Sequence, residues 1–194
     1  SGIVTGDLTV EVLSEGVHSG DASGVLASSF RVLRHLLSRL EDPETGKVIE
    51  GFHDEIPAER DDQARASAEV LGDDVFCKFP FVKGMQPMHS DRTELVLNRT
   101  WRPALSYTGI GGMPELDSAG NVLRPFTALK LSMRLPATVD GHEATLAIKE
   151  TLETDPPANA KVSFEADHSA SGWNAPAIAP WLHASLEKEL NCTP

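Results

Sequence analysis

The sequence lacks the features that mark several classes of protein. Only 6% of its 194 residues are aromatic, and its two cysteines, Cys77 and Cys192, form no C-x-x-C pair. No apolar stretch approaches the roughly 18 residues that a membrane-spanning helix needs, and the first residues lack the basic and apolar regions of a signal peptide. We therefore expect no membrane partner. Two isolated thiols favour a reducing compartment, hence the cytoplasm, with a single disulfide and an upstream signal peptide left open.

Positive charge is also scarce. The chain has 17 Lys and Arg against 29 Asp and Glu, a net charge of −12. A nucleic-acid-binding protein neutralises phosphates with clustered basic residues, but the densest basic cluster here, Arg31, Arg34 and Arg39, alternates with leucines on a helical pattern. We interpret it as the solvated face of an amphipathic helix. The predicted strands also lack aromatic pairs on which RNA would stack, so we expect no nucleic-acid partner.

Periodicity predicts both strands and helices. Strands are predicted where apolar and polar residues alternate, over residues 7–14, 104–108, 127–135 and 161–166. A long helix is predicted from the apolar stripe Leu26, Phe30, Leu33, Leu37 and Leu40, and it ends before Pro43 because proline cannot continue a helix. Another runs from the cap Asp140 to about Glu153. The last predicted helix carries Ile178, Leu182, Leu186 and Leu190 on one face.

Residues 43–103 are less regular. A short polar helix is predicted over 57–71, and Asp91 and Glu94 form a capping pair for another helix through Leu97. We interpret 43–103 as a helical insertion within a single domain, residues 1–194. The remaining β-α-β-β-α-β order predicts an α+β, ferredoxin-like split βαβ fold, a four-stranded antiparallel sheet with helices on one face. The open face or an edge strand then needs a cover or a partner.

Several possible sites have a simpler interpretation. The run His53-Asp54-Glu55 has side chains that diverge in any regular structure, and no ligand spacing accompanies it, so we predict no metal site. Residues 109–112 (GIGG) lack the context of a phosphate-binding loop and are predicted to form a turn. Cys77 is expected to be a buried thiol and Cys192 a tail residue.

Three polar residues stand out, two of them with two interpretations. His18 lies in a glycine-flanked loop, where it either donates a hydrogen bond to an oxyanion or caps the following helix as an exposed residue. Arg134 lies on the polar side of an alternating strand and is either a bidentate carboxylate ligand or, as the residues alone favour, a solvated arginine. Asn121 follows a glycine and is typical of a turn.

Four segments in order carry a family resemblance: GVHSG at 16–20, LSYTGIGG at 105–112, NVLRP at 121–125 and LSMRLP at 131–136. Together they resemble the lid, or dimerisation domain, of the zinc metallopeptidase family of carboxypeptidase G, carnosinase-type dipeptidases, aminoacylase and succinyl-diaminopimelate desuccinylase. The insertion and the loop around Trp173 are similar to the carnosinase branch. The third segment departs from the family by a leucine and an extra arginine, and the fourth by an early proline.

The resemblance implies roles for the three polar residues. It implies that His18 reaches into the partner subunit's active site and polarises the scissile carbonyl or stabilises the oxyanion. It implies that Asn121 contacts substrate across the dimer, and that Arg134 binds a substrate carboxylate. The implied partners are a second copy of the chain, the catalytic domain of the same polypeptide, and a peptide or N-acyl amino acid.

The family's metal ligands are not recognisable in this sequence. The His-x-Asp motif, the bridging Asp, the Glu-Glu pair with the general base and the distant His belong to catalytic-domain segments that flank the lid. The resemblance therefore implies two zinc ions in a catalytic domain outside this chain, no cofactor within it, and no hydrolysis by the chain alone. The alternative is a stand-alone, non-catalytic dimerisation or protein-interaction module.

Overall fold

The computed structural model describes residues 1–176 and 179–190. Its centre is a four-stranded antiparallel sheet in the order β3-β5-β1-β6. The strands are β1 (Gly2–Glu11), β3 (Ala104–Gly111), β5 (Phe126–Leu135) and β6 (Lys161–Ala170). This is the order expected of a ferredoxin-like split βαβ fold, and the predicted fold class is confirmed.

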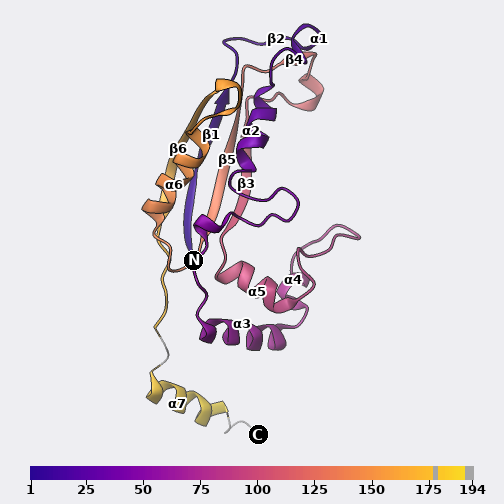
Figure 1. The fold of residues 1–194 in the computed structure, drawn as a ribbon. Helices are drawn as coiled ribbons and strands as arrows, with labels where there is room; N and C mark the ends of the chain where they lie inside the picture. Colours follow the sequence, from indigo (N-terminus) through magenta and orange to yellow (C-terminus); the bar gives the residue numbers. More distant parts are fainter. Residues whose placement is uncertain (177–178, 191–194) are drawn as a thin grey trace.

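Two helices, α2 (Ser29–Leu37) and α6 (Gly141–Glu153), lie along one face of the sheet (Figure 1). Each begins at a side chain that accepts backbone N–H groups. The Ser28 hydroxyl accepts from Arg31 N at 3.3 Å, and the Asp140 carboxylate accepts from two backbone amides at 2.9 and 3.0 Å. The predicted cap at Asp140 is confirmed.

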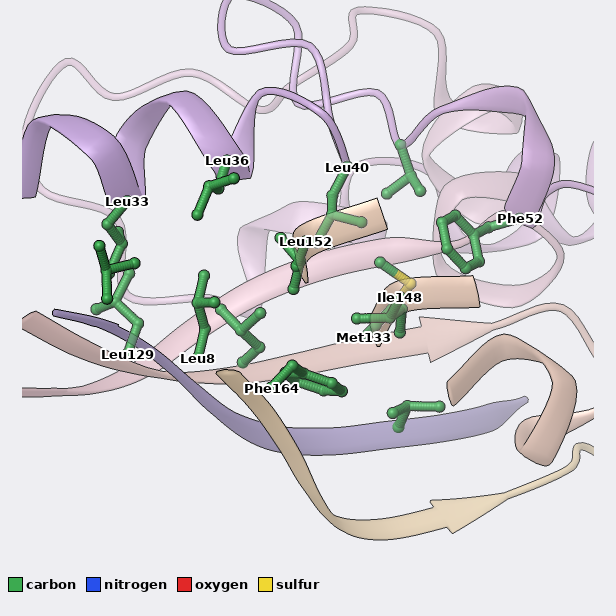
Figure 2. Packing of buried hydrophobic residues seen from close by; sticks show 14 of the residues in the cluster. Leu8, Leu33, Leu36, Leu40, Phe52, Leu129, Met133, Ile148, Leu152 and Phe164 are labelled. Atoms are coloured by element: carbon green, nitrogen blue, oxygen red, sulfur yellow. The ribbon is translucent and has the colours of Figure 1, made fainter. Parts of the chain in front are cut away.

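The core lies between this helical layer and the sheet. Along β5 the side chains alternate, with Leu131, Met133 and Leu135 buried against the helices and the residues between them turned to the open face. Figure 2 shows leucines of α2 and α6 converging on Leu8, Leu129 and Phe164 of three neighbouring strands. The helix-covered face is therefore apolar, and the opposite face is free to carry polar groups.

Three strands extend beyond their predicted bounds. β1 begins at Gly2 and ends at Glu11, where 7–14 was predicted, and β6 continues to Ala170. The predicted turn at 109–112 is wrong for its first three residues, because 109–111 pair with 128–130 of β5 after a bulge that follows Tyr107. Pairing with a neighbouring strand outweighs the low strand propensity of glycine here.

The first helix is shorter than predicted, and its buried stripe differs. Leu26 precedes α2 and Leu40 follows it, although Leu40 is fully buried. Phe30 is 44% exposed, while Val32 and Leu36, outside the predicted stripe, are buried. The apolar spacing therefore predicted a helix here but not which of its side chains face the sheet.

The insertion has a small hydrophobic cluster of its own. It contains η1 (Glu50–Phe52), α3 (Ala58–Leu71), α4 (Asp74–Cys77) and α5 (Arg92–Thr100). Ala64 and Ala68 of α3 pack with Val75, Val96 and Leu97. The predicted cap at Asp91 is confirmed by its bond from Thr93 N at 2.7 Å. Cys77 is exposed, so its prediction as a buried thiol is wrong: the short helix α4 turns Val75, not Cys77, into the cluster.

The last helix, α7, spans Pro180–Leu190. Of its predicted apolar face, Ile178 and the side chains of Leu186 and Leu190 lie outside the described residues, as does Cys192. Trp181 and Leu182 are exposed. Among the helices that are described, none combines the length and the apolar character needed to cross a membrane.

Candidate functional site

The two predicted site residues His18 and Asn121 lie together at one end of the sheet. Here β2 (Val17–His18) pairs with β4 (Val122–Leu123), and His18 lies opposite Val122. The backbone N–H of Ser19 donates to the carbonyl of Asn121 at 2.9 Å. We call this end the tip: residues 13–25 and 112–123, which include β2, α1 (Ser19–Ala22), η2 (Leu116–Ser118) and β4. The sequence predicted loops here, since two-residue strands leave no periodicity.

His18 is exposed at the tip and caps α1. Its Nδ1 accepts a hydrogen bond from the backbone N–H of Gly20 at 3.1 Å. In a neutral imidazole one nitrogen accepts and the other carries the proton, so this bond leaves the proton on Nε2. The two interpretations of His18 are thus compatible: Nδ1 serves as the cap while Nε2–H remains available as a donor.

Gly20 allows the His18 ring to lie close to the backbone. A Cβ at position 20 would be 2.8 Å from His18 Cε1 and 3.0 Å from Nδ1. A larger residue would therefore force the imidazole to move. The glycine at position 20 thus leaves room for the ring in this orientation.

Arg134 lies at the other end of the sheet, on the open face. It pairs with Ile3 on β1 and Ala104 on β3, and its side chain is exposed. The described residues give it no ion-pair partner. Since β5 rises about 3.3 Å per residue, the eight residues from Phe126 to Arg134 separate it from the tip by roughly 26 Å. The structure thus brings His18 and Asn121 together but not Arg134.

The middle of the open face carries an ion-pair network that the sequence did not indicate. Lys130 Nζ lies 2.8 Å from a carboxylate oxygen of Asp7 and 2.7 Å from one of Asp167. The Thr5 hydroxyl donates to Asp167 at 2.5 Å. The Lys130 ammonium, followed by the Thr5 hydroxyl, lowers the pKa of Asp167 to about 2. These contacts link β1, β5 and β6 in the part of the sheet between the tip and Arg134.

Two arginines hold structural positions that sequence reasoning missed. Arg124 Nε donates to the carbonyl of Gly112 at 3.0 Å and so holds the end of β3 to the tip. Arg39 donates to the carbonyls of Thr151, Thr154 and Asp155 at 3.3, 2.6 and 2.7 Å. The prediction of a solvated basic face is therefore wrong for Arg39, which satisfies the end of α6.

The described residues contain no cluster of potential metal-ligating side chains. In residues 1–176 and 179–190, no three His, Cys, Asp or Glu side chains are grouped to hold a metal. His53 of the run His53-Asp54-Glu55 uses its Nε2 in a 2.9 Å contact with the carbonyl of Val48.

The comparison with protein families decides the classification. The Peptidase dimerisation domain family, M20_dimer, matches residues 1–160. The chain belongs to this M20 family. M20 peptidases are hydrolases. The search of curated proteins found no match.

Solved structures show the same fold at low sequence identity. The chain is similar to the di-peptidase Dug1p of Saccharomyces cerevisiae (20% identity, TM-score 0.66) and to human carnosine dipeptidase 1 (19%, 0.67). It is also similar to the M20 family metallo-carboxypeptidase Sso-CP2 of Sulfolobus solfataricus (16%, 0.69). The matches cover 96, 98 and 99% of this chain but only 39, 41 and 43% of those chains. The chain thus spans about two fifths of these relatives.

Proposed function

We propose that this chain is the lid and dimerisation domain of a dizinc peptidase or amidohydrolase of the dipeptidase or carboxypeptidase type. His18 and Asn121 would complete the active site of the partner subunit, and Arg134 would bind the carboxylate of a peptide or N-acyl amino acid. A catalytic domain elsewhere in the polypeptide would supply the metal ligands and the general base. When bound there, the zinc ions would supply an activated water.

The observation that carries the proposal is the placement of two kinds of polar group at opposite ends of one sheet. At the tip, His18 presents a protonated Nε2 as a hydrogen-bond donor, suited to an oxygen on which negative charge develops. At the other end, Arg134 presents a guanidinium suited to a carboxylate. Since these groups are roughly 26 Å apart, one small substrate cannot touch both within one chain.

A two-fold pairing of edge strands would bring the two ends together. β3 is an edge of the sheet, residues 106–110 are exposed, and its eight residues include no charged side chain. The other edge, β6, carries Lys161, Glu165 and Asp167, the kind of charge that protects an edge. We therefore assign β3 as the dimer edge. Antiparallel β3–β3 pairing would place the tip of one subunit beside the Arg134 end of its partner.

The experiment is a kinetic comparison of single variants of the full-length polypeptide. We expect His18→Ala to lower kcat/KM about 10²-fold or more, because losing an oxyanion donor typically costs that much. A value within about threefold of wild type would contradict the oxyanion role.

Arg134→Ala tests the carboxylate-binding role separately from the oxyanion role of His18. We expect it to raise KM roughly 10- to 100-fold, the effect of losing hydrogen bonds to a charged partner. His35→Ala, on the exposed side of α2, is the matched control for His18 and should leave both kinetic constants close to wild type. Unchanged KM in Arg134→Ala would contradict carboxylate binding.

A further inference from the structure

The insertion ends in an exposed loop that is both apolar and positively charged. We call residues 78–89 the insertion loop. Val82 and Met88 are 76 and 74% exposed, and Phe79, Phe81 and Met85 are exposed as well. Lys78 and Lys83 supply its charge, and no Asp or Glu occurs between Val75 and Ser90 in a chain of net charge −12. Exposed apolar groups gathered in this way mark an interaction surface.

The tip has the opposite charge and a similar apolar character. Leu116 and Val25 are 91 and 82% exposed, and Met113 and Val122 are also exposed. Residues 13–30 and 112–123 contain no Lys or Arg, and they carry four exposed carboxylates: Glu15, Asp21, Glu115 and Asp117. Among the described residues, neither these carboxylates nor the two loop lysines form an ion pair.

The edge strand β3 connects the two surfaces. It begins at Ala104, directly after the insertion, and ends at Gly111, directly before the tip. The insertion loop lies on the β3 side, because Met88 packs against Gly46 of the segment whose Glu41 accepts a hydrogen bond from Tyr107 of β3. Figure 1 shows the insertion helices and the tip at opposite ends of the sheet. The two surfaces cannot meet within one chain.

We infer that the insertion loop of each subunit docks on the tip of its partner. In antiparallel β3–β3 pairing, Ala104 of one subunit lies opposite Gly111 of the other, so each insertion loop faces the partner's tip. Both junctions then bring lysines to carboxylates and cover apolar side chains on both sides. The insertion loop thus binds a second copy of this chain, and this contact holds the partner's His18 in position. This inference rests on the dimer of the proposed function.

Charge reversal tests the docking. The loop-reversed variant, Lys78→Glu with Lys83→Glu, has an acidic loop and an acidic tip. The tip-reversed variant, Glu115→Lys with Asp117→Lys, has a basic loop and a tip with reduced negative charge. We expect each variant alone to dimerise roughly tenfold or more weakly than wild type, because two acidic surfaces meet in the loop-reversed variant and the attraction between loop and tip is lost in the tip-reversed variant. An equimolar mixture should instead form mainly heterodimers, since one junction regains the wild-type pairing of a basic loop with an acidic tip and the other no longer brings two acidic surfaces together.

Sedimentation velocity of the 194-residue chain and native mass spectrometry of the mixture give the readout. The matched control, Asp62→Lys with Glu69→Lys on the exposed side of α3, changes net charge as the tip-reversed variant does and should dimerise like wild type. Wild-type dissociation constants in both reversed variants, with statistical mixing, would overturn the docking and leave the dimer intact. A wild-type chain that stays monomeric at tens of micromolar would overturn the docking together with the dimer.

Discussion

The two faces of the central sheet have different roles, although the same strands form both. On β5, Met133 and Leu135 are buried under the helices, and Arg134 between them is exposed on the open face. The covered face supplies the apolar burial that stabilises the fold. The open face and the tip carry the groups proposed to meet substrate. Neighbouring residues of one strand should therefore respond to substitution in different ways.

The largest effect is expected on the covered face. Leu135→Ala should lower the free energy of unfolding by about 2–5 kcal/mol, because it removes a fully buried side chain and leaves a cavity. Its neighbour Arg134→Ala should change the free energy of unfolding by no more than about 0.5 kcal/mol. Urea unfolding of both variants checks this, and equal losses would mean that the open face also contributes to the core.

A smaller and purely kinetic effect is expected at the tip. Gly20→Ala should displace the His18 ring, whose Cε1 would lie 2.8 Å from the new Cβ. The ring can rotate, so the free energy of unfolding should stay near that of wild type. We expect kcat/KM of the full-length polypeptide to fall roughly 10- to 100-fold, as misplacement of a catalytic group does. The control is Gly51→Ala, where a Cβ meets nothing within 4 Å. Equal kinetics of the two variants would contradict the ring's role.

The smallest effect concerns the ion pairs of the open face. The pKa of Asp167 is lowered from 3.8 to about 2, chiefly by Lys130. A carboxyl group whose pKa is lowered by folding stabilises the protein. This stabilisation is fully present above the pKa of the unfolded state and is lost as the pH falls through the pKa of the folded state. The stability difference between wild type and Asp167→Asn should thus be constant above about pH 5 and shrink between pH 4 and 2. Urea midpoints measured at pH 6, 4, 3 and 2 check this, and a constant difference would contradict the pairing.

Most of the sheet and its helical cover could be predicted from local pattern. The alternation of 127–135 gave β5 within one residue, and α3 and α6 begin one residue after Pro57 and Asp140. Features that depend on pairing could not be predicted in this way. The strand over 109–111 forms because β5 lies beside it, and the β2–β4 pair exists because the tip brings Val17 and Leu123 together.

The residues of the candidate site were selected from the sequence, but their arrangement could not be predicted from it. His18, Asn121 and Arg134 were all selected from the sequence, yet nothing local indicates that the first two lie together and the third lies roughly 26 Å away. That separation follows from strand order, since Arg134 is at the far end of β5 from the tip. The bond from Gly20 that directs the His18 ring also became visible only in three dimensions.

The central claim is that His18 and Arg134 of one chain serve different active sites. Its most direct test mixes full-length His18→Ala and Arg134→Ala chains after reversible dissociation and measures hydrolysis. At a substrate concentration well below KM, each variant alone should have little activity. A heterodimer would contain one site with an intact arginine from one chain and an intact histidine from the other, so mixing should restore activity toward one site per heterodimer. If both residues act within one chain, neither site is restored, and a mixture no more active than its components would contradict the account.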